Sequence, residues 1–267
     1  MSNPTSPRTL KTVDTASAVL EGLVELDGAG VTELADHLDV SKSTAYTYLK
    51  SLEGQEFVSK RGDTYRLSYR FLLLGEYVRN DSLLYRFGRG EVDRVAEELG
   101  HYAHLVVEEY GRGVSIYEAK GESAADYEYQ ETKLQRPSPL HVTASGKAIL
   151  SQLPEERVDE VVDEHGLERW TEHTITEDAA LREELETVRE RGFAYNDEEE
   201  IEGFRAVAAP VCGADGSVLG AVTVSGPTSF LDDESLRTGL PERVTTAATN
   251  VEVSINMMRR NSDVRDR

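Results

Sequence analysis

Residues 31–58 read VTELADHLDVSKSTAYTYLKSLEGQEFV and contain two short runs with helical periodicity. Apolar residues recur every three or four positions before and after Asp39-Val40, which is typical of two amphipathic helices separated by a tight turn. Ser41 is the expected N-cap of the second helix. Two short helices that meet at such a turn, the second with hydroxyl and basic side chains near its N-terminus, are the pattern of a helix-turn-helix whose recognition helix enters a DNA major groove.

The second helix divides into a core side and a polar side. Ala45, Leu49 and Leu52 share the core side at helical spacing. The side chains expected to project toward DNA are Ser41, Lys42, Ser43, Thr44, Tyr46, Thr47 and Lys50. The alternative is an ordinary helical hairpin with a solvated polar face.

The residues after this helix argue against that alternative. FVSK (57–60) and TYRLS (64–68) flank a polar turn, which predicts a short hairpin, or wing. The wing adds Lys60, Arg61 and Arg66 to the expected DNA-contacting residues. We expect the basic side chains Lys42, Lys60, Arg61 and Arg66 at phosphates, which hold register, and Ser43, Thr44, Tyr46 and Thr47 at base edges, which specify sequence.

The charge of the chain is strongly negative but unevenly distributed. The formal net charge is −21 over 267 residues, of which residues 71–267 carry −19. Residues 41–70 instead have a net charge of +3, so a basic face sits within an acidic protein. The negative net charge therefore does not exclude DNA binding, because the phosphates are contacted only by this basic face. The acidic excess resembles that of cytosolic proteins from halophilic archaea, where we expect this chain to originate.

The remaining composition narrows the class of protein. No run approaches the roughly 18 apolar residues of a membrane span, and residues 1–9 lack a secretory signal, so we expect a cytoplasmic protein that does not bind membranes. Cys212 is the one cysteine, which excludes an internal disulfide and a cysteine cluster for zinc or iron–sulfur. We expect no metal and no cofactor. The length suits two domains.

Two further regions complete the expected organisation. Residues 69–88 form a helical stretch too rich in leucine and aromatic residues for a solvated linker, which predicts packing against a partner. From residue 91, helical and strand patterns alternate, and GADG (213–216) joins two apolar strands. We therefore expect a DNA-binding domain at 1–70, a dimerisation helix at 71–88 and a larger α+β domain at 89–267.

Two motifs of the larger domain predict a ligand site. In HVTASGKAIL (141–150), small residues precede a helix, so the amides near Thr143, Ala144 and Ser145 could face an anion. In GAVTVSGP (220–227), strand alternation places the Thr223 and Ser225 hydroxyls on one face. Convergent hydroxyls without a charged side chain favour a small carboxylate or polyol, and the alternative is a polar strand face in solvent.

With these motifs, the chain resembles an IclR-family transcription regulator from near residue 10 to near residue 258. The resemblance rests on the helix-turn-helix, on HVTASGKAIL and on GFRAVAAPVCGADGSVLGAVTVSGP (203–227). It implies a winged helix-turn-helix, a GAF-like effector-binding domain with an antiparallel sheet, and a homodimer or tetramer on a two-fold related operator in double-stranded DNA. Operator binding would then change when the effector binds.

The family's effector contacts can be carried over residue by residue. They fall on Thr143, Ala144, Ser145, Asn196, Ala206, Thr223 and Ser225. Some members that bind small oxoacids have Asp at the position of Asn196 and Cys at that of Ala206. These two departures put that ligand class in doubt for this chain.

Other functions have less support in the sequence. His101 and His104 are three residues apart on an expected strand, which places them on opposite faces and disfavours a shared metal. The acidic tract 121–132 and the run at 197–200 lack calcium-loop spacing and are interpreted as solvated charge. An enzyme would need an activated nucleophile, and no such motif is visible. A purely structural DNA-bridging protein is the third alternative.

Overall fold

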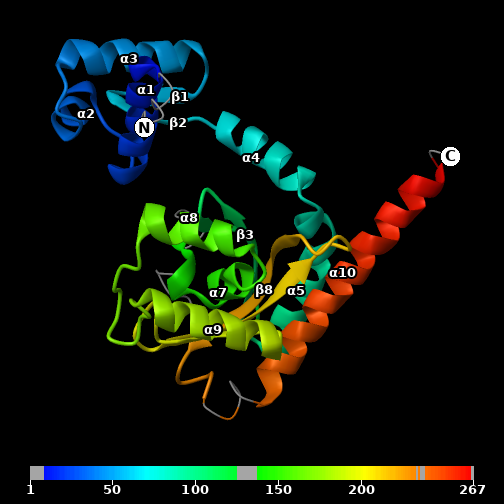
Figure 1. Cartoon of the computed structure of the whole chain (residues 1–267). Coiled ribbons are helices and arrows are strands. Elements are labelled where there is room, and N and C mark those ends of the chain that lie inside the picture. Colours follow the sequence, from blue (N-terminus) through cyan, green and yellow to red (C-terminus); the bar gives the residue numbers. More distant parts are fainter. Residues whose placement is uncertain (1–8, 125–136, 233, 235–237, 266–267) are drawn as a thin grey trace, which may run out of the picture. The chain divides into compact units, whose positions relative to one another are not determined.

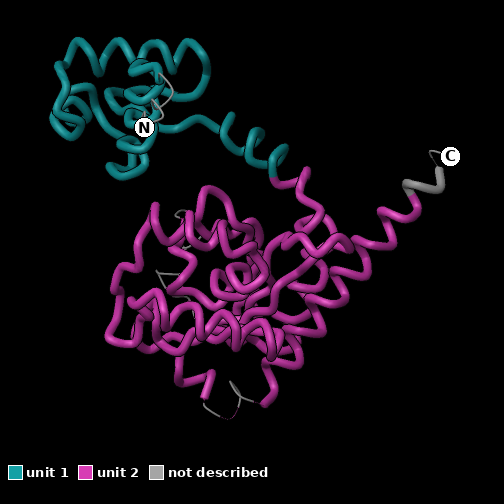
Figure 2. The backbone as a smooth tube through the Cα atoms, viewed as in Figure 1, with its two compact units in different colours: residues 1–78 teal, residues 79–267 magenta. Residues whose placement is uncertain are grey.

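The computed structural model describes residues 9–124, 137–232, 234 and 238–265. Most of the acidic tract expected at 121–132 lies outside these residues. The chain forms two compact units, residues 1–78 and residues 79–267 (Figure 2). None of the helices among the described residues has the length and apolar character needed to cross a bilayer.

Unit 1 is a winged helix-turn-helix followed by a further helix (Figure 1). Its elements are α1 (Lys11–Glu25), α2 (Val31–His37), α3 (Lys42–Gly54), β1 (Val58–Arg61), β2 (Thr64–Leu67) and most of α4 (Arg70–Asp81), which crosses the boundary after residue 78. Apolar side chains from the first three helices and the antiparallel β1–β2 hairpin form one core, which includes Val19, Leu34, Leu49 and Tyr65.

The turn between α2 and α3 has the predicted form. Asp39 adopts φ 51°, in the left-handed region that Asp tolerates better than bulky residues. The Val40 amide donates to the Ala35 carbonyl at 3.0 Å, which closes the end of α2. The Ser41 hydroxyl accepts from the Thr44 amide at 3.0 Å and caps α3, as predicted.

The apolar stretch predicted as one helix at 69–88 is two helices. α4 ends at Asp81 and α5 (Leu83–Leu99) begins after Ser82, whose hydroxyl accepts from the Tyr85 amide at 3.3 Å. Ser82 has extended backbone angles, φ −67° and ψ 121°, and therefore interrupts the helical path. α5 ends at Leu99, and the next residue, Gly100, caps it with φ 74°.

Unit 2 is an antiparallel sheet with helices on both faces. Beyond α5 its elements are β3 (Tyr102–Glu109), β4 (Arg112–Lys120), β5 (Ser138–Pro139), η1 (Leu140–Val142), α7 (Ala144–Leu150), α8 (Glu155–His165), α9 (Asp178–Arg191), β6 (Ala194–Asp197), β7 (Phe204–Cys212), β8 (Val218–Pro227) and α10 (Leu240–Arg265). The strand order is β5-β4-β3-β8-β7-β6, with every neighbouring pair antiparallel. This is the predicted α+β class.

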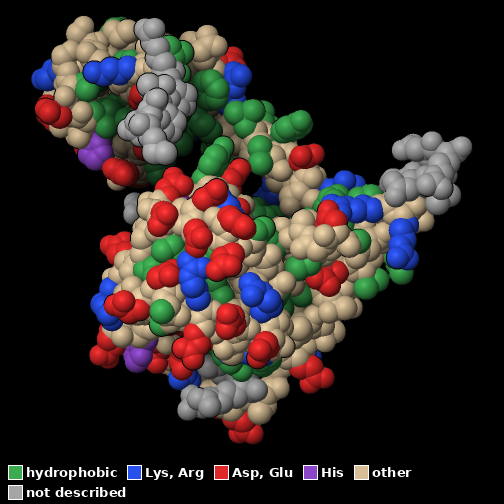
Figure 3. Space-filling view, viewed as in Figure 1, with side chains coloured by type: hydrophobic (Ala, Val, Ile, Leu, Met, Phe, Trp, Pro, Cys, Tyr) green, Lys and Arg blue, Asp and Glu red, His purple; other side chains and the backbone are tan. Residues whose placement is uncertain are grey.

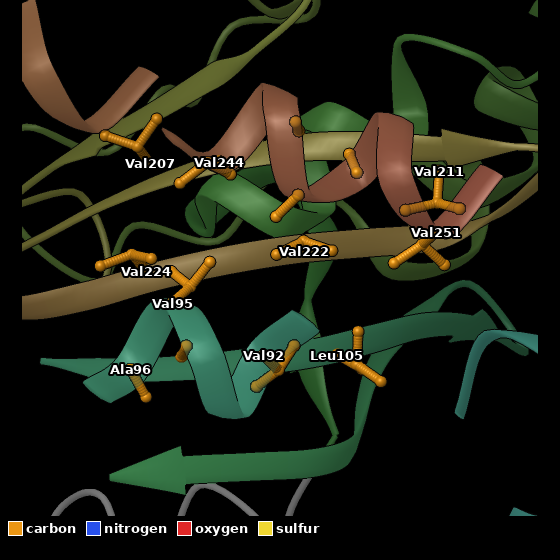
Figure 4. Packing of buried hydrophobic residues seen from close by; sticks show 14 of the residues in the cluster. Val92, Val95, Ala96, Leu105, Val207, Val211, Val222, Val224, Val244 and Val251 are labelled. Carbon is orange, nitrogen blue, oxygen red and sulfur yellow. The ribbon is translucent and has the colours of Figure 1, made fainter. Parts of the chain in front are cut away.

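One face of the sheet carries the main core. Val92 and Val95 of α5 and Val244 and Val251 of α10 pack against alternate side chains of β3, β7 and β8 (Figure 4). Val222 is among those strand residues and is fully buried. Because side chains alternate along a strand, one set of strand residues packs against α5 and α10, and the other set faces α7.

The opposite face is covered by α7, with α8 and α9 beyond it. The chain doubles back tightly from η1 into α7. A Cβ atom at Gly146 would lie 2.0 Å from the Leu140 carbonyl oxygen, so only glycine fits this position. This close approach holds the start of α7 against the polar face of the sheet.

Candidate functional site

The polar face of α3 is exposed as predicted from its periodicity. Ala45 and Leu49 are buried, whereas the seven residues expected at DNA are exposed or, for Thr44, half-buried. Tyr46 is 52% exposed, which is high for a large aromatic side chain. The helix therefore presents hydroxyl, phenol and ammonium groups to solvent while its other side completes the core of unit 1.

Several of these side chains are already engaged within the helix. The Thr44 and Ser41 hydroxyls are 2.8 Å apart, and the Thr47 hydroxyl donates to the Ser43 carbonyl at 2.8 Å. Lys50 forms an ion pair with Glu53, which raises the pKa of the lysine. Among the described residues, Lys42, Ser43 and Tyr46 have no side-chain hydrogen bond or ion pair.

The wing is basic but its three cations differ. Lys60 and Arg61 are exposed, and the Lys60 ammonium lies 5.4 Å from the centre of the Tyr65 ring. Arg66 is held by Asp27, with guanidinium-to-carboxylate distances of 2.8 and 3.3 Å. Arg66 therefore braces the turn after α1, and Lys60 and Arg61 remain better placed for phosphate.

In unit 2, the antiparallel register brings three expected ligand residues into one row. Asn196 of β6 pairs with Ala206 of β7, which pairs with Ser225 of β8. Thr223 lies in the next row, opposite Ala208. Residues directly opposite one another share a face, so these side chains all lie on the α7 face of the sheet.

The remaining expected ligand residues lie at the start of α7. Thr143 caps the helix, because its hydroxyl accepts from the Gly146 amide at 2.9 Å, and the Ser145 hydroxyl lies 3.4 Å from it. Ala144 packs among the apolar residues beneath the helix. All seven expected residues are buried, none more than 5% exposed.

A small hollow adjoins this set. It is lined by residues of β3, β4, β5 and the start of α7, namely Val106, Gly113, Ser115, Ser138, Thr143 and Ser145. The buried hydroxyl oxygens of Ser115 and Thr223 have no hydrogen-bond partner among the described residues. Buried polar atoms are normally paired, so these oxygens indicate a place where a ligand or water supplies the partner.

The same rows contain two residues absent from the sequence-based set. Continuing across the sheet, Thr223 pairs with His104 of β3, which pairs with Glu118 of β4. His104 is 1% exposed, and its Nε2 atom lies 2.9 Å from the Ser225 hydroxyl. His101, weighed with it as a metal ligand, instead lies beside Phe230, and burial lowers the pKa of His101.

Asn196 is less available than its position suggests. Its side-chain oxygen accepts from the Glu199 amide at 2.9 Å and the Glu200 amide at 3.4 Å. Glu199, 7% exposed, forms a 2.5 Å ion pair with the buried Lys147 of α7. Burial raises the pKa of Glu199, and the nearby ammonium opposes this shift. The run 197–200, interpreted from sequence as solvated, thus contains two buried carboxylates.

Comparison with known proteins agrees with this architecture. The family models for the IclR helix-turn-helix domain and the bacterial transcriptional regulator IclR C-terminal domain match residues 12–62 and 80–253. A probable HTH-type transcriptional regulator ArcR of Halobacterium salinarum is 38% identical, over 95% of this chain and 97% of its own.

Solved structures give the same result. The crystal structure of Thermotoga maritima IclR superposes with a TM-score of 0.74 at 26% identity, covering 92% of this chain and 99% of its own. An IclR homologue from Microbacterium hydrocarbonoxydans, solved with 4-hydroxybenzoate, has a TM-score of 0.74 at 20% identity, covering 91% and 98%. At 20% identity, the similarity to the Microbacterium homologue is a similarity of fold.

The fold and the two family models define a DNA-binding transcription regulator with a C-terminal effector-binding domain. The relatives with curated names are transcriptional regulators and repressors, and none of those described is an enzyme. The chain belongs to the IclR family.

Proposed function

We propose that this regulator binds a two-fold related operator through α3 and the wing, and that a small ligand on the α7 face of the sheet changes operator affinity. The observation that carries the proposal is the exposed polar face of α3 beside a basic hairpin, within a chain of net charge −21. A basic face in an otherwise acidic protein is expected if this face contacts the phosphates of DNA, because Lys and Arg side chains neutralise them.

The proposed DNA contacts follow the availability of the side chains. Lys42, Lys60 and Arg61 contact phosphates, and Ser43 and Tyr46 reach base edges, with Thr47 offering its oxygen as an acceptor. Ser41 and Thr44 set the helix start, Lys50 contributes only if it leaves Glu53, and Arg66 positions the wing through Asp27.

The proposed assembly is a homodimer or tetramer. α4 has no buried residue, and Leu73 and Tyr77 are 73% and 77% exposed. A helix so apolar on its surface is expected to pack against a second copy, which gives the two recognition helices the symmetry of the operator. In domain terms, we assign DNA binding to 1–70, dimerisation to 71–88 and effector binding, on a GAF-like fold, to 89–267.

The proposed effector is a small organic molecule, a carboxylate or a polyol. Buried hydroxyls at Thr143, Ser145, Thr223 and Ser225 offer hydrogen bonds, and Ala144 and Ala206 are small apolar residues of the same buried face. The homologue solved with 4-hydroxybenzoate supports a small carboxylate as one candidate. A ligand that binds one arrangement of the dimer more tightly shifts DNA affinity by the same factor that DNA shifts ligand affinity. We place the protein in the cytoplasm.

The decisive experiment selects operator fragments from random duplexes with the full chain and then measures their affinity in the variants. Lys42→Ala combined with Lys60→Ala should weaken binding to all sequences and lower the salt slope of the dimer by about 4, one unit for each of the phosphate contacts that its two protomers lose. Ser43→Ala should mainly relax sequence preference. Lys120→Ala, which removes an exposed lysine of β4 in unit 2, is the control. Wild-type affinity in the double variant would refute the interface.

A further inference from the structure

Glu118, His104 and Ser225 form a polar chain across three adjacent strands, β4, β3 and β8. His104 Nδ1 lies 3.2 Å from Glu118 Oε2, and its Nε2 lies 2.9 Å from Ser225 Oγ. The imidazole is 1% exposed and Ser225 is 3% exposed. The chain therefore runs from a partly buried carboxylate to a hydroxyl on the floor of the proposed effector site.

The carboxylate determines which nitrogen of His104 always carries a proton. A lone pair on Nδ1 facing Glu118 would meet a negative charge, so Nδ1 bears hydrogen in the neutral and in the cationic imidazole. The contact is close but not aligned as a hydrogen bond, so Glu118 acts mainly through its charge. Only Nε2, the atom next to Ser225, then changes between the two states.

That change reverses the role of Ser225. With neutral His104, Nε2 is an acceptor, so the Ser225 hydroxyl donates its one hydrogen to Nε2. Ser225 can then only accept a hydrogen bond from a ligand. With cationic His104, Nε2 donates to Ser225 Oγ, and the serine proton is released toward the ligand. The hydrogen-bond polarity of the floor is therefore linked to one proton.

Further aromatic and charged groups among the described residues lie near His104. The Tyr102 ring stacks with the imidazole at 6.3 Å between centres, and the Lys120 ammonium lies 5.9 Å from the Tyr102 ring. On α7, which packs over this face, Lys147 is paired with Glu199. Among the described residues, Glu118 is the carboxylate that faces the imidazole, and its charge would balance that of a protonated His104.

We infer that the Glu118–His104–Ser225 chain makes the effector site selective for a carboxylate, which binds together with one proton. A ligand carboxylate accepts from the Ser225 hydroxyl and from Thr223, whose oxygen has no hydrogen-bond partner among the described residues. The proton taken from solvent by Nε2 offsets the added negative charge beside Glu118. A hydroxyl ligand would use the neutral state and exchange no proton. The inference rests on the effector site proposed above and names its ligand class.

The test titrates the full chain by calorimetry with matched acids and neutral amides: benzoate and benzamide, 4-hydroxybenzoate and 4-hydroxybenzamide, lactate and lactamide. Two buffers of different ionisation enthalpy report proton uptake. At least one acid should bind at least about tenfold more tightly than its amide, with close to one proton taken up, and affinity should fall by at most about tenfold per pH unit as pH rises.

His104→Gln should abolish proton uptake and flatten the pH dependence, because an amide does not titrate. His101→Gln is the matched control, because it removes a neighbouring histidine that is not part of the Glu118–His104–Ser225 group. This variant should keep the proton uptake and the pH dependence. Amides that bind as tightly as acids, or acid binding without proton uptake in the wild type, would overturn the inference even if His104→Gln did not fold.

The same measurements test the proposed effector site separately from its selectivity for a carboxylate. If polyols or amides alter operator affinity while no acid in the panel binds, the carboxylate assignment is wrong and the effector site survives. If neither the panel nor polyols change operator affinity, both proposals fail.

Discussion

At the scale of single residues, Lys147 is unusual because a lysine with 1% exposure lies in the interior of unit 2. Its ammonium is 2.5 Å from one oxygen of Glu199 and 4.0 Å from Glu184. Desolvating two charges offsets much of their attraction, so such a pair stabilises little over an apolar pair. Removing one partner alone leaves a buried charge without compensation.

Lys147→Met should therefore lower the free energy of unfolding by about 3 to 5 kcal/mol, whereas Lys147→Met with Glu199→Leu should recover most of the loss. Denaturant unfolding of both variants measures the difference. Lys50→Ala, which breaks an exposed ion pair on α3, should leave stability nearly unchanged, because solvent screens such a pair. A double variant no more stable than Lys147→Met would contradict this view of the pair.

His141 gives a pH dependence of known sign. Burial lowers the pKa of His141, and its hydrogen bond from Nε2 to the Glu168 carbonyl, at 2.9 Å, only partly opposes this. Its folded-state pKa lies below its unfolded value, so the unfolded chain binds the extra proton first. The stabilisation by neutral His141 is present above about pH 6.5 and is lost as pH falls toward the folded-state pKa.

We expect wild-type stability to decline more steeply than that of His141→Gln between about pH 7 and about pH 5. The slope difference amounts to at most about 1.4 kcal/mol per pH unit, the value for one proton. The comparison isolates His141 from Glu199, whose raised pKa acts in the opposite direction. Parallel pH profiles for the two proteins would mean that His141 titrates alike in both states.

At the scale of elements, α4 is the helix whose surface least suits an isolated chain. Tyr69, directly before the helix, and Leu73 and Tyr77 within it are four residues apart and are each at least 73% exposed. Figure 3 shows hydrophobic side chains gathered along this helix, in contrast to the acidic surface of unit 2. Burying such a stripe against its copy is the expected source of dimer stability.

Leu73→Glu should weaken the dimer by at least about tenfold, since it places a charge within the apolar stripe. Sedimentation equilibrium measures the association, and operator affinity should fall with it. Thr12→Glu adds the same charge at an exposed position of α1 and serves as the control. A monomeric wild type at micromolar concentration would remove the dimer from the proposed function.

The elements also show why the sequence is informative in some places and silent in others. The α2–turn–α3 unit depends on signals within about 20 residues, the cap Ser41 and the turn at Asp39, and it was predictable from periodicity and caps. The break at Ser82 carried the same kind of signal, a serine before an apolar run, yet the hydrophobic content of 69–88 obscured it.

The ligand face was only half predictable. Thr223 and Ser225 follow from alternation within one strand, but His104 joins them through pairing between β3 and β8, segments more than a hundred residues apart. No local pattern specifies that register. The burial of Glu199 and Glu200 depends in the same way on α7 lying over β6 and β7, which the acidic run itself does not indicate.

At the scale of the whole molecule, charge links stability to salt. Residues 71–267 account for a net charge of −19, and acidic side chains predominate on the face of unit 2 in Figure 3. Mutual repulsion among these carboxylates opposes the compact state and is screened by ions. DNA binding responds in the opposite direction, because salt weakens contacts to phosphate.

We expect the free energy of unfolding to rise between about 0.1 M and about 1 M potassium chloride, while operator affinity falls over the same range. Thermal unfolding and fluorescence anisotropy measure the two trends. Sucrose at equal osmolality, which does not screen charge, should leave operator affinity nearly unchanged. Stability that is independent of salt would show that the surface carboxylates do not interact strongly.

Among the residues that the structure describes, the cores of the two units share none: that of unit 1 ends at Leu67, and those of unit 2 begin at Leu83. The intervening helix α4 has no buried residue. A genetic crossover within the codons for α4 would therefore join DNA-reading and effector-reading halves from different ancestors without opening either core. Such a joint lets new pairings of operator and effector arise by recombination, with each half inherited already folded.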